Sequence, residues 1–144
     1  MFSPNEILKI VGDVCRKYEC IYAVLFGSYA RGDSKKYSDI DIAVMFRKNN
    51  IDYLSKAMDI AFDLEEIFNV KVDVVPLNIA DLIVRYQVYS EGKLAYCEDY
   101  NKYMDDKINS IDLYLDFSYH FEKFYRKTLR EIRDAVSRSK DEDR

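Results

Sequence analysis

Apolar positions repeat with two different periods along this chain, and the change of period marks the predicted elements. A capping box at residues 3–6, followed by apolar residues three or four positions apart, predicts a first helix of about four turns. Two short apolar runs then predict strands over residues 21–26 and 39–46, and the first run ends at Gly27. The sequence does not give the relative direction of these strands, so parallel and antiparallel pairing both stay open.

The middle of the chain repeats this alternation of helix and strand. An apolar stripe predicts a helix over residues 54–68, formed by Leu54, Ala57, Met58, Ala61, Leu64, Ile67 and Phe68. Residues 70–75 read as a third strand stopped by Pro76, a further helix runs towards Gly92, and residues 94–97 fit a short edge strand.

From residue 100 onward, apolar residues keep three-and-four spacing without an internal proline or glycine. This pattern predicts one long helix or two helices in series, with polar residues from Ser137 expected to fray. We therefore expect a domain over residues 1–99 and a helical extension over residues 100–144 that packs on this domain or on a partner.

Composition narrows the possible functions. The 144 residues carry a formal net charge of −4, which argues against the broad basic surface that nucleic-acid binding needs. Three cysteines at spacings that match no zinc site or redox pair predict reduced thiols. No apolar run approaches the roughly 20 residues that span a bilayer, so we expect a cytoplasmic protein.

Three aspartates are the candidate catalytic and metal-binding residues. Asp39 and Asp41 lie two positions apart at the start of a predicted strand, so their side chains share one face. Asp73 interrupts an apolar strand, where a buried charge needs a partner or a metal. If the two strands are neighbours, the three carboxylates form a site suited to Mg²⁺. The alternatives are a solvated loop-to-strand junction for the pair and an edge-strand acid facing water for Asp73.

Gly27 and Ser28 are candidate nucleotide-binding residues because they follow a strand and open a predicted short helix. Backbone N–H groups gather at such a turn, and a missing Cβ lets a phosphate approach. A tight turn with a helix cap is the alternative interpretation. Arg31 could contact a triphosphate oxygen or pair with Asp33, and the sequence does not separate these two roles.

Together these residues resemble a known family. Gly27-Ser28, ten intervening residues and Asp39-x-Asp41 form the signature of the polymerase-beta-like nucleotidyltransferases. The string GSYARGDSKKYSDIDIAV is similar to the minimal nucleotidyltransferases, especially the MntA-type antitoxins encoded beside HEPN-domain HepT toxins. The resemblance covers residues 21–98, with Asp73 as the third carboxylate.

The resemblance implies an α/β (α+β) fold with a mixed β-sheet flanked by helices, to which this chain adds the long C-terminal helix. It also implies two Mg²⁺ ions, ATP as the donor, and AMP transfer to a tyrosine hydroxyl of a HEPN toxin. Asp39, Asp41 and Asp73 would hold one ion, and Asp39 and Asp41 the second.

Two other functions stay open. A small hydroxylated acceptor such as an aminoglycoside would use the same chemistry, although no second substrate domain is evident. Alternatively, the chain is an antitoxin that neutralises a toxin by binding alone.

Overall fold

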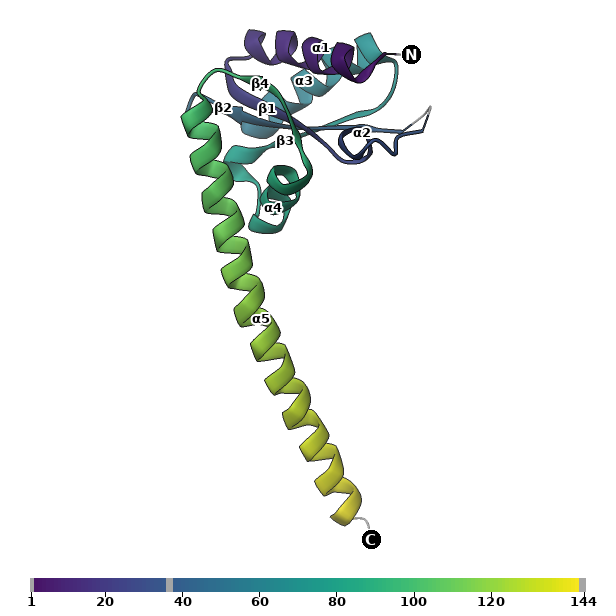
Figure 1. The fold of residues 1–144 in the computed structure, drawn as a ribbon, viewed down its shortest axis with the longest axis vertical. Coiled ribbons are helices and arrows are strands. Elements are labelled where there is room, and N and C mark those ends of the chain that lie inside the picture. The colour runs from purple at the N-terminus through teal and green to yellow at the C-terminus, as the bar shows by residue number, and fades with distance from the viewer. Residues whose placement is uncertain (1, 36–37, 143–144) are drawn as a thin grey trace. The chain divides into compact units, whose positions relative to one another are not determined.

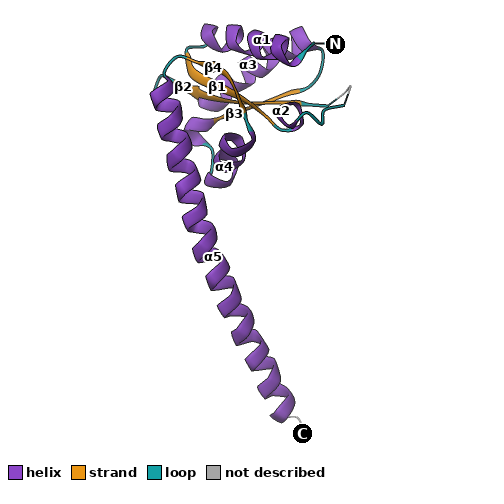
Figure 2. Cartoon of the chain, viewed as in Figure 1, coloured by secondary structure: helices purple, strands orange, loops and turns teal. Residues whose placement is uncertain are grey.

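The computed structural model describes residues 2–35 and 38–142, so residues 36 and 37 of the motif loop lie outside the described part. Five helices and four strands alternate along it (Figures 1 and 2). The helices are α1 (Pro4–Lys17), α2 (Ser28–Arg31), α3 (Tyr53–Phe68), α4 (Leu82–Glu91) and α5 (Tyr100–Glu142). The strands are β1 (Cys20–Phe26), β2 (Ile40–Phe46), β3 (Val72–Pro76) and β4 (Lys93–Cys97), and a 3₁₀ turn covers Leu77–Ile79.

The four strands form one mixed sheet in the order β3-β2-β1-β4. β1 pairs antiparallel with both β2 and β4, whereas β2 and β3 run parallel. The predicted α/β class with a mixed sheet is therefore confirmed, and β4 is an edge strand as expected. The question of strand direction is settled as antiparallel for the first two strands, and the long α3 crossover permits the parallel pair.

Two apolar clusters hold the first 111 residues together. One contains Ile7, Val11 and Cys15 of α1, Ile60 and Leu64 of α3, and residues from one face of the sheet. The other packs Tyr22 and Val24 of β1 against Val88 and Tyr89 of α4 and Tyr103 of α5. Helices thus cover both faces of the sheet on which the candidate site is built.

The predicted stripe of α3 needs a correction. Ala57, Leu64 and Phe68 are buried as expected, but Leu54, Met58 and Ile67 are 60%, 71% and 44% exposed. Ile60 is buried in their place. The predicted stripe was too broad, because α3 packs with only one narrow line of side chains against β3 and α1.

Helix α5 is a single helix, which settles the choice between one helix and two. It is helical as far as Glu142, so the fraying expected from Ser137 is not seen in the described residues. The chain divides into compact units at residues 1–111 and 112–144, whereas the expected division at residue 99 marks the start of α5. Tyr103 and Ser110 are buried, which explains why the first turns of α5 belong with the sheet.

None of the helices in the described residues is both long enough and apolar enough to cross a bilayer.

Candidate active site

The candidate site lies at one end of the three strands β1, β2 and β3. Phe26, the last residue of β1, pairs with Asp41 near the start of β2. Asp41 in turn pairs with Asp73 near the start of β3. Strand register therefore sets Gly27, Asp41 and Asp73 side by side, although they are far apart in the sequence.

Gly27 makes a close approach to Asp41 that any side chain at this position would disturb. Its φ is +73°, a left-handed conformation that glycine adopts at little cost. A Cβ at this position would collide with Oδ2 of Asp41. The carbonyl of Gly27 accepts hydrogen bonds from the N–H groups of Ala30 and Arg31, both at 3.1 Å, which close the turn into α2. Ser28, half-buried, is the first residue of that helix.

The electrostatics of Asp41 are those of a crowded carboxylate. Burial, followed by the negative charges of Asp73 and Asp39, raises its pKa above the ordinary value, while Arg31 and Lys71 oppose the rise. All three predicted acids therefore lie close enough to interact. A bound cation would relieve the repulsion between them.

The three acids differ in their exposure and partners. Asp39 is exposed and precedes β2, and Asp73 is half-buried in β3. Asp73 pairs with Lys71 at 3.6 Å, and because the Lys71 and Asp73 side chains are 66% and 47% exposed, the pair is weak. Within residues 2–35 and 38–142, no three histidine, cysteine or acidic side chains are arranged as a ready metal site. The metal-binding roles of Asp39, Asp41 and Asp73 stay predictions.

The chemistry of the site nevertheless fits divalent metal. The carboxylate oxygens of Asp39, Asp41 and Asp73 are the hard donors that Mg²⁺ prefers. The turn at Gly27, without a Cβ, leaves backbone rather than side chain next to Asp41. Carboxylates gathered beside a turn of backbone suit a metal-bound phosphate chain.

Arg31 has carboxylate partners in the structure. Its guanidinium contacts Asp33 and Glu91, each at 3.3 Å, and these contacts raise its pKa, with Asp33 the larger cause. The pairing with Asp33 was one of the two roles left open by the sequence; triphosphate binding stays a prediction.

Sequence reasoning missed Glu91 and Lys71. Of these two, only Lys71 could have been predicted, because it lies two residues before Asp73 in the same predicted strand.

Residues 9–101 match the family model described as polymerase beta, nucleotidyltransferase. This match spans well over half of the chain. The chain belongs to the polymerase beta nucleotidyltransferase family. The candidate site lies within the matched residues, and the resemblance seen in the motif string is confirmed at family level.

Named relatives of this nucleotidyltransferase point the same way. It is 36% identical over 91 residues to the protein adenylyltransferase MntA of Shewanella oneidensis, and the alignment covers 63% of this chain and 63% of that protein. The match thus spans less than two thirds of the length of that relative.

Solved structures share the fold over more of the chain. A toxin-antitoxin crystal structure with AMP-PNP matches at a TM-score of 0.70 and 23% identity, covering 89% of this chain and 99% of that one. A complex of a tri-AMPylated HEPN toxin of Shewanella oneidensis with an MNT antitoxin matches at a TM-score of 0.67 and 20% identity. It covers 87% of this chain and 98% of the matched chain.

Proposed function

We propose that this chain is an antitoxin that transfers AMP from ATP to a tyrosine hydroxyl of a HEPN-domain toxin, and does so with Mg²⁺. The observation that carries the proposal is the strand register that sets Asp73 beside Asp41, against the turn at Gly27. The family match supports the type of chemistry, and the MntA relative and the complex with an AMPylated toxin support the acceptor. The fold neighbour solved with AMP-PNP supports ATP as the donor.

In the proposed reaction, the tyrosine oxygen attacks the α-phosphorus of ATP. The bond from that phosphorus to the bridging oxygen breaks, and pyrophosphate leaves with the bonding electrons. The Mg²⁺ ions would lower the pKa of the attacking hydroxyl and neutralise the pyrophosphate. Asp39 and Asp41 would hold both ions, and Asp73 would hold one and is the candidate acceptor of the hydroxyl proton.

The residues around the acids have separate roles in this proposal. Backbone at Gly27, which has no side chain and lies against Asp41, would bind the phosphate chain together with the Ser28 hydroxyl. Arg31 would exchange its weak, exposed contacts with Asp33 and Glu91 for a triphosphate oxygen. We further propose the cytoplasm as the place of action, in keeping with the free thiols of Cys15, Cys20 and Cys97.

The test is adenylylation of the co-encoded toxin. The protein is incubated with ATP, MgCl₂ and the purified HEPN toxin, and the toxin is analysed by intact mass and peptide mapping. We expect a mass increase of one or more AMP units on a tyrosine, which is absent with EDTA and absent with the Asp39→Asn/Asp41→Asn variant. An unmodified toxin, or an equal adduct with that variant, would contradict the proposal.

Neutralisation by binding alone is a second candidate function, and one observation favours it. Residues 113–136 of α5 expose a series of large apolar side chains. If Asp39→Asn/Asp41→Asn protects cells from the toxin as fully as the wild type at equal expression, binding is sufficient. Lost protection with retained binding supports catalysis instead. The remaining alternative, a small hydroxylated acceptor, would show as pyrophosphate release with an aminoglycoside and no toxin.

A further inference from the structure

The segment of α5 after Ile111 carries an apolar strip that the structure leaves uncovered. Phe117, Phe121, Phe124 and Ile132 follow one another at intervals of four, three and eight residues, so they share one face of the helix. Their exposed fractions are 51%, 57%, 67% and 53%. Single exposed apolar residues are common, but a continuous strip marks an interaction surface.

The strip is also ordered in advance. The rings of Phe117 and Phe121 stack with centroids 6.0 Å apart, and those of Phe121 and Tyr125 stack at 6.3 Å. Stacked aromatic side chains on a helix lose little conformational entropy when a partner covers them. Apolar anchors spaced three and four residues apart are typical of a helix that binds in an apolar groove.

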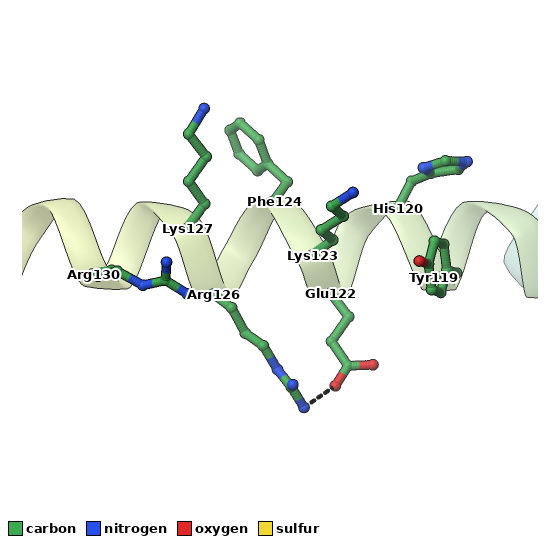
Figure 3. Close-up of a pocket in the computed structure, with 8 residues that line it drawn as sticks. All are labelled: Tyr119, His120, Glu122, Lys123, Phe124, Arg126, Lys127 and Arg130. Carbon is green, nitrogen blue, oxygen red and sulfur yellow. Dashed lines mark hydrogen bonds and ion pairs between the residues drawn. The ribbon is translucent and has the colours of Figure 1, made fainter.

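Charges beside the strip indicate the sign of its partner. Residues 122–134 contain three acids, Glu122, Glu131 and Asp134, and five cationic residues: Lys123, Arg126, Lys127, Arg130 and Arg133. In the described part of the chain, only Arg126 of these five has a carboxylate partner, Glu122 at 2.6 Å. Figure 3 shows this pair on one side of the helix, and Lys127 with Phe124 on the other. Arg126, Arg130 and Arg133 lie away from the strip, so only Lys123 and Lys127, on the side of Phe124 and unpaired in the described residues, favour an acidic partner.

The charge balance favours a protein over a lipid surface or RNA. Residues 112–142 contain seven basic and seven acidic residues, and the whole chain has a net charge of −4. Binding to anionic lipid or to a phosphate backbone depends on net positive charge over the whole contacting segment. A protein partner does not require net positive charge. A groove on such a partner, with an apolar floor and a few carboxylates, would match the strip and its unpaired lysines.

We propose that residues 113–136 of α5 are the docking helix for the acceptor toxin, whose matching surface is an apolar groove bordered by carboxylates. This inference rests on the proposed function for the identity of the partner. Docking then uses surface outside the candidate active site. Loss of the strip raises the KM for the toxin and leaves kcat at saturating toxin unchanged.

The experiment measures affinity and catalysis separately with the full chain and the co-encoded toxin. Titration calorimetry on the Asp39→Asn/Asp41→Asn background gives Kd without turnover, and adenylylation by the otherwise wild-type protein gives KM and kcat. Phe121→Ala/Phe124→Ala removes two anchors, and Lys123→Glu/Lys127→Glu reverses the adjacent charge. Leu115→Ala is the matched control, because Leu115 is 54% exposed on the opposite face of the same helix.

We expect the double alanine variant to weaken Kd and raise KM by roughly 30-fold or more, as loss of a binding hot spot does. The charge reversal should weaken Kd about tenfold with a strong dependence on salt. Leu115→Ala should stay within about twofold of the wild type. Unchanged affinity in the alanine variant, or an equal loss with Leu115→Ala, would overturn the inference.

Other occupants of the strip give different results. If the strip pairs two copies of this chain, Phe121→Ala/Phe124→Ala converts a dimer into a monomer in light scattering and leaves toxin affinity unchanged. If the strip binds lipid, the same variant no longer sediments with phosphatidylserine vesicles, and its affinity for the toxin is unchanged. Either result overturns the inference. If the wild-type protein binds the toxin through the strip but adds no AMP, only the proposed function is contradicted. If it adds AMP but its affinity for the toxin does not depend on the strip, only the docking helix is contradicted.

Discussion

The strand ends at Gly27, Asp41 and Asp73 and the exposed part of α5 are built by opposite means. At the strand ends, long-range pairing brings together residues that are distant in the sequence, and polar groups face one another at close quarters. Along residues 113–136, neighbours in the sequence make the surface by helical periodicity, and half or more of each phenylalanine residue is exposed. The first region lies within residues 1–111, whereas the second is uncovered in the described residues, so the two proposals predict that chemistry and recognition are separable.

The largest effect should come from Asp41, which is the most crowded of the three acids. Asp41→Asn removes a charge that both metal ions would need, so we expect the rate of AMP transfer to fall by about 1,000-fold or more. Toxin affinity should stay within about twofold, because the proposed docking helix is untouched. A quenched-flow adenylylation assay and a titration with the same variant check both values. A fall in affinity as large as the fall in rate would show that the two regions are not separable.

The next effect compares two aromatic positions on the same helix. Tyr103 is buried and packs edge-to-face on Tyr22, with ring centroids 5.2 Å apart. Tyr103→Ala should therefore lower the free energy of unfolding by about 3 kcal/mol. Phe121→Ala removes a ring that is 57% exposed and should cost about 0.5 kcal/mol or less. Urea unfolding followed by circular dichroism compares the two variants, and similar losses would show that the strip is already covered.

A smaller effect is expected from substituting glycines, and comparing two of them separates a steric clash at the candidate active site from backbone strain alone. Gly27→Ala and Gly32→Ala both place a Cβ on a residue with positive φ, +73° and +81°. At Gly27 the Cβ would collide with Asp41, but at Gly32 it would meet nothing within 4 Å. We expect the strain at Gly32 to cost about 1 kcal/mol of stability with normal activity.

Gly27→Ala should lose about 10- to 100-fold in activity at a stability cost of about 2 kcal/mol, because Asp41 must move. Thermal unfolding and steady-state kinetics of the two variants provide the comparison. Equal activity in both would mean that the close approach of Gly27 to Asp41 has no catalytic role.

The smallest effect concerns Arg31, whose side chain is 45% exposed. Arg31→Ala should raise the KM for ATP by about two- to fivefold and leave stability unchanged, since exposed ion pairs contribute little. Arg31→Lys should recover part of the loss if charge alone matters. An unchanged KM in Arg31→Ala would assign the residue to its contacts with Asp33 and Glu91 only.

Local signals in the sequence predicted most elements of the fold. The capping box at Ser3 and Glu6 forms as expected, with both hydrogen bonds present. Asp81 caps α4 through the N–H of Val84, and the order of strands and helices follows the apolar pattern. These features depend on residues a few positions apart, which is why a sequence contains them.

Features that depend on distant pairing could not be predicted in the same way. The spacing of Gly27-Ser28 to Asp39 and Asp41 identified half of the candidate site, but only the parallel register of β2 and β3 brings Asp73 to Asp41. The contact of Arg31 with Glu91 joins residues 60 positions apart. The exposure of Leu54 and Met58 depends on how α3 is packed, which no periodicity gives.

The parallel pairing of β2 and β3 also bears on the order of folding. β1 and β2 can pair as an antiparallel unit, because only the short helix α2 and the loop after it separate them in the sequence. β3 is separated from β2 by the whole of α3, and we expect such non-local pairing to close more slowly than that of β1 and β2. Asp73 therefore meets Asp41 late, so a chain still emerging from the ribosome would hold two of the three acids together and acquire the third only when residue 73 and its strand have emerged.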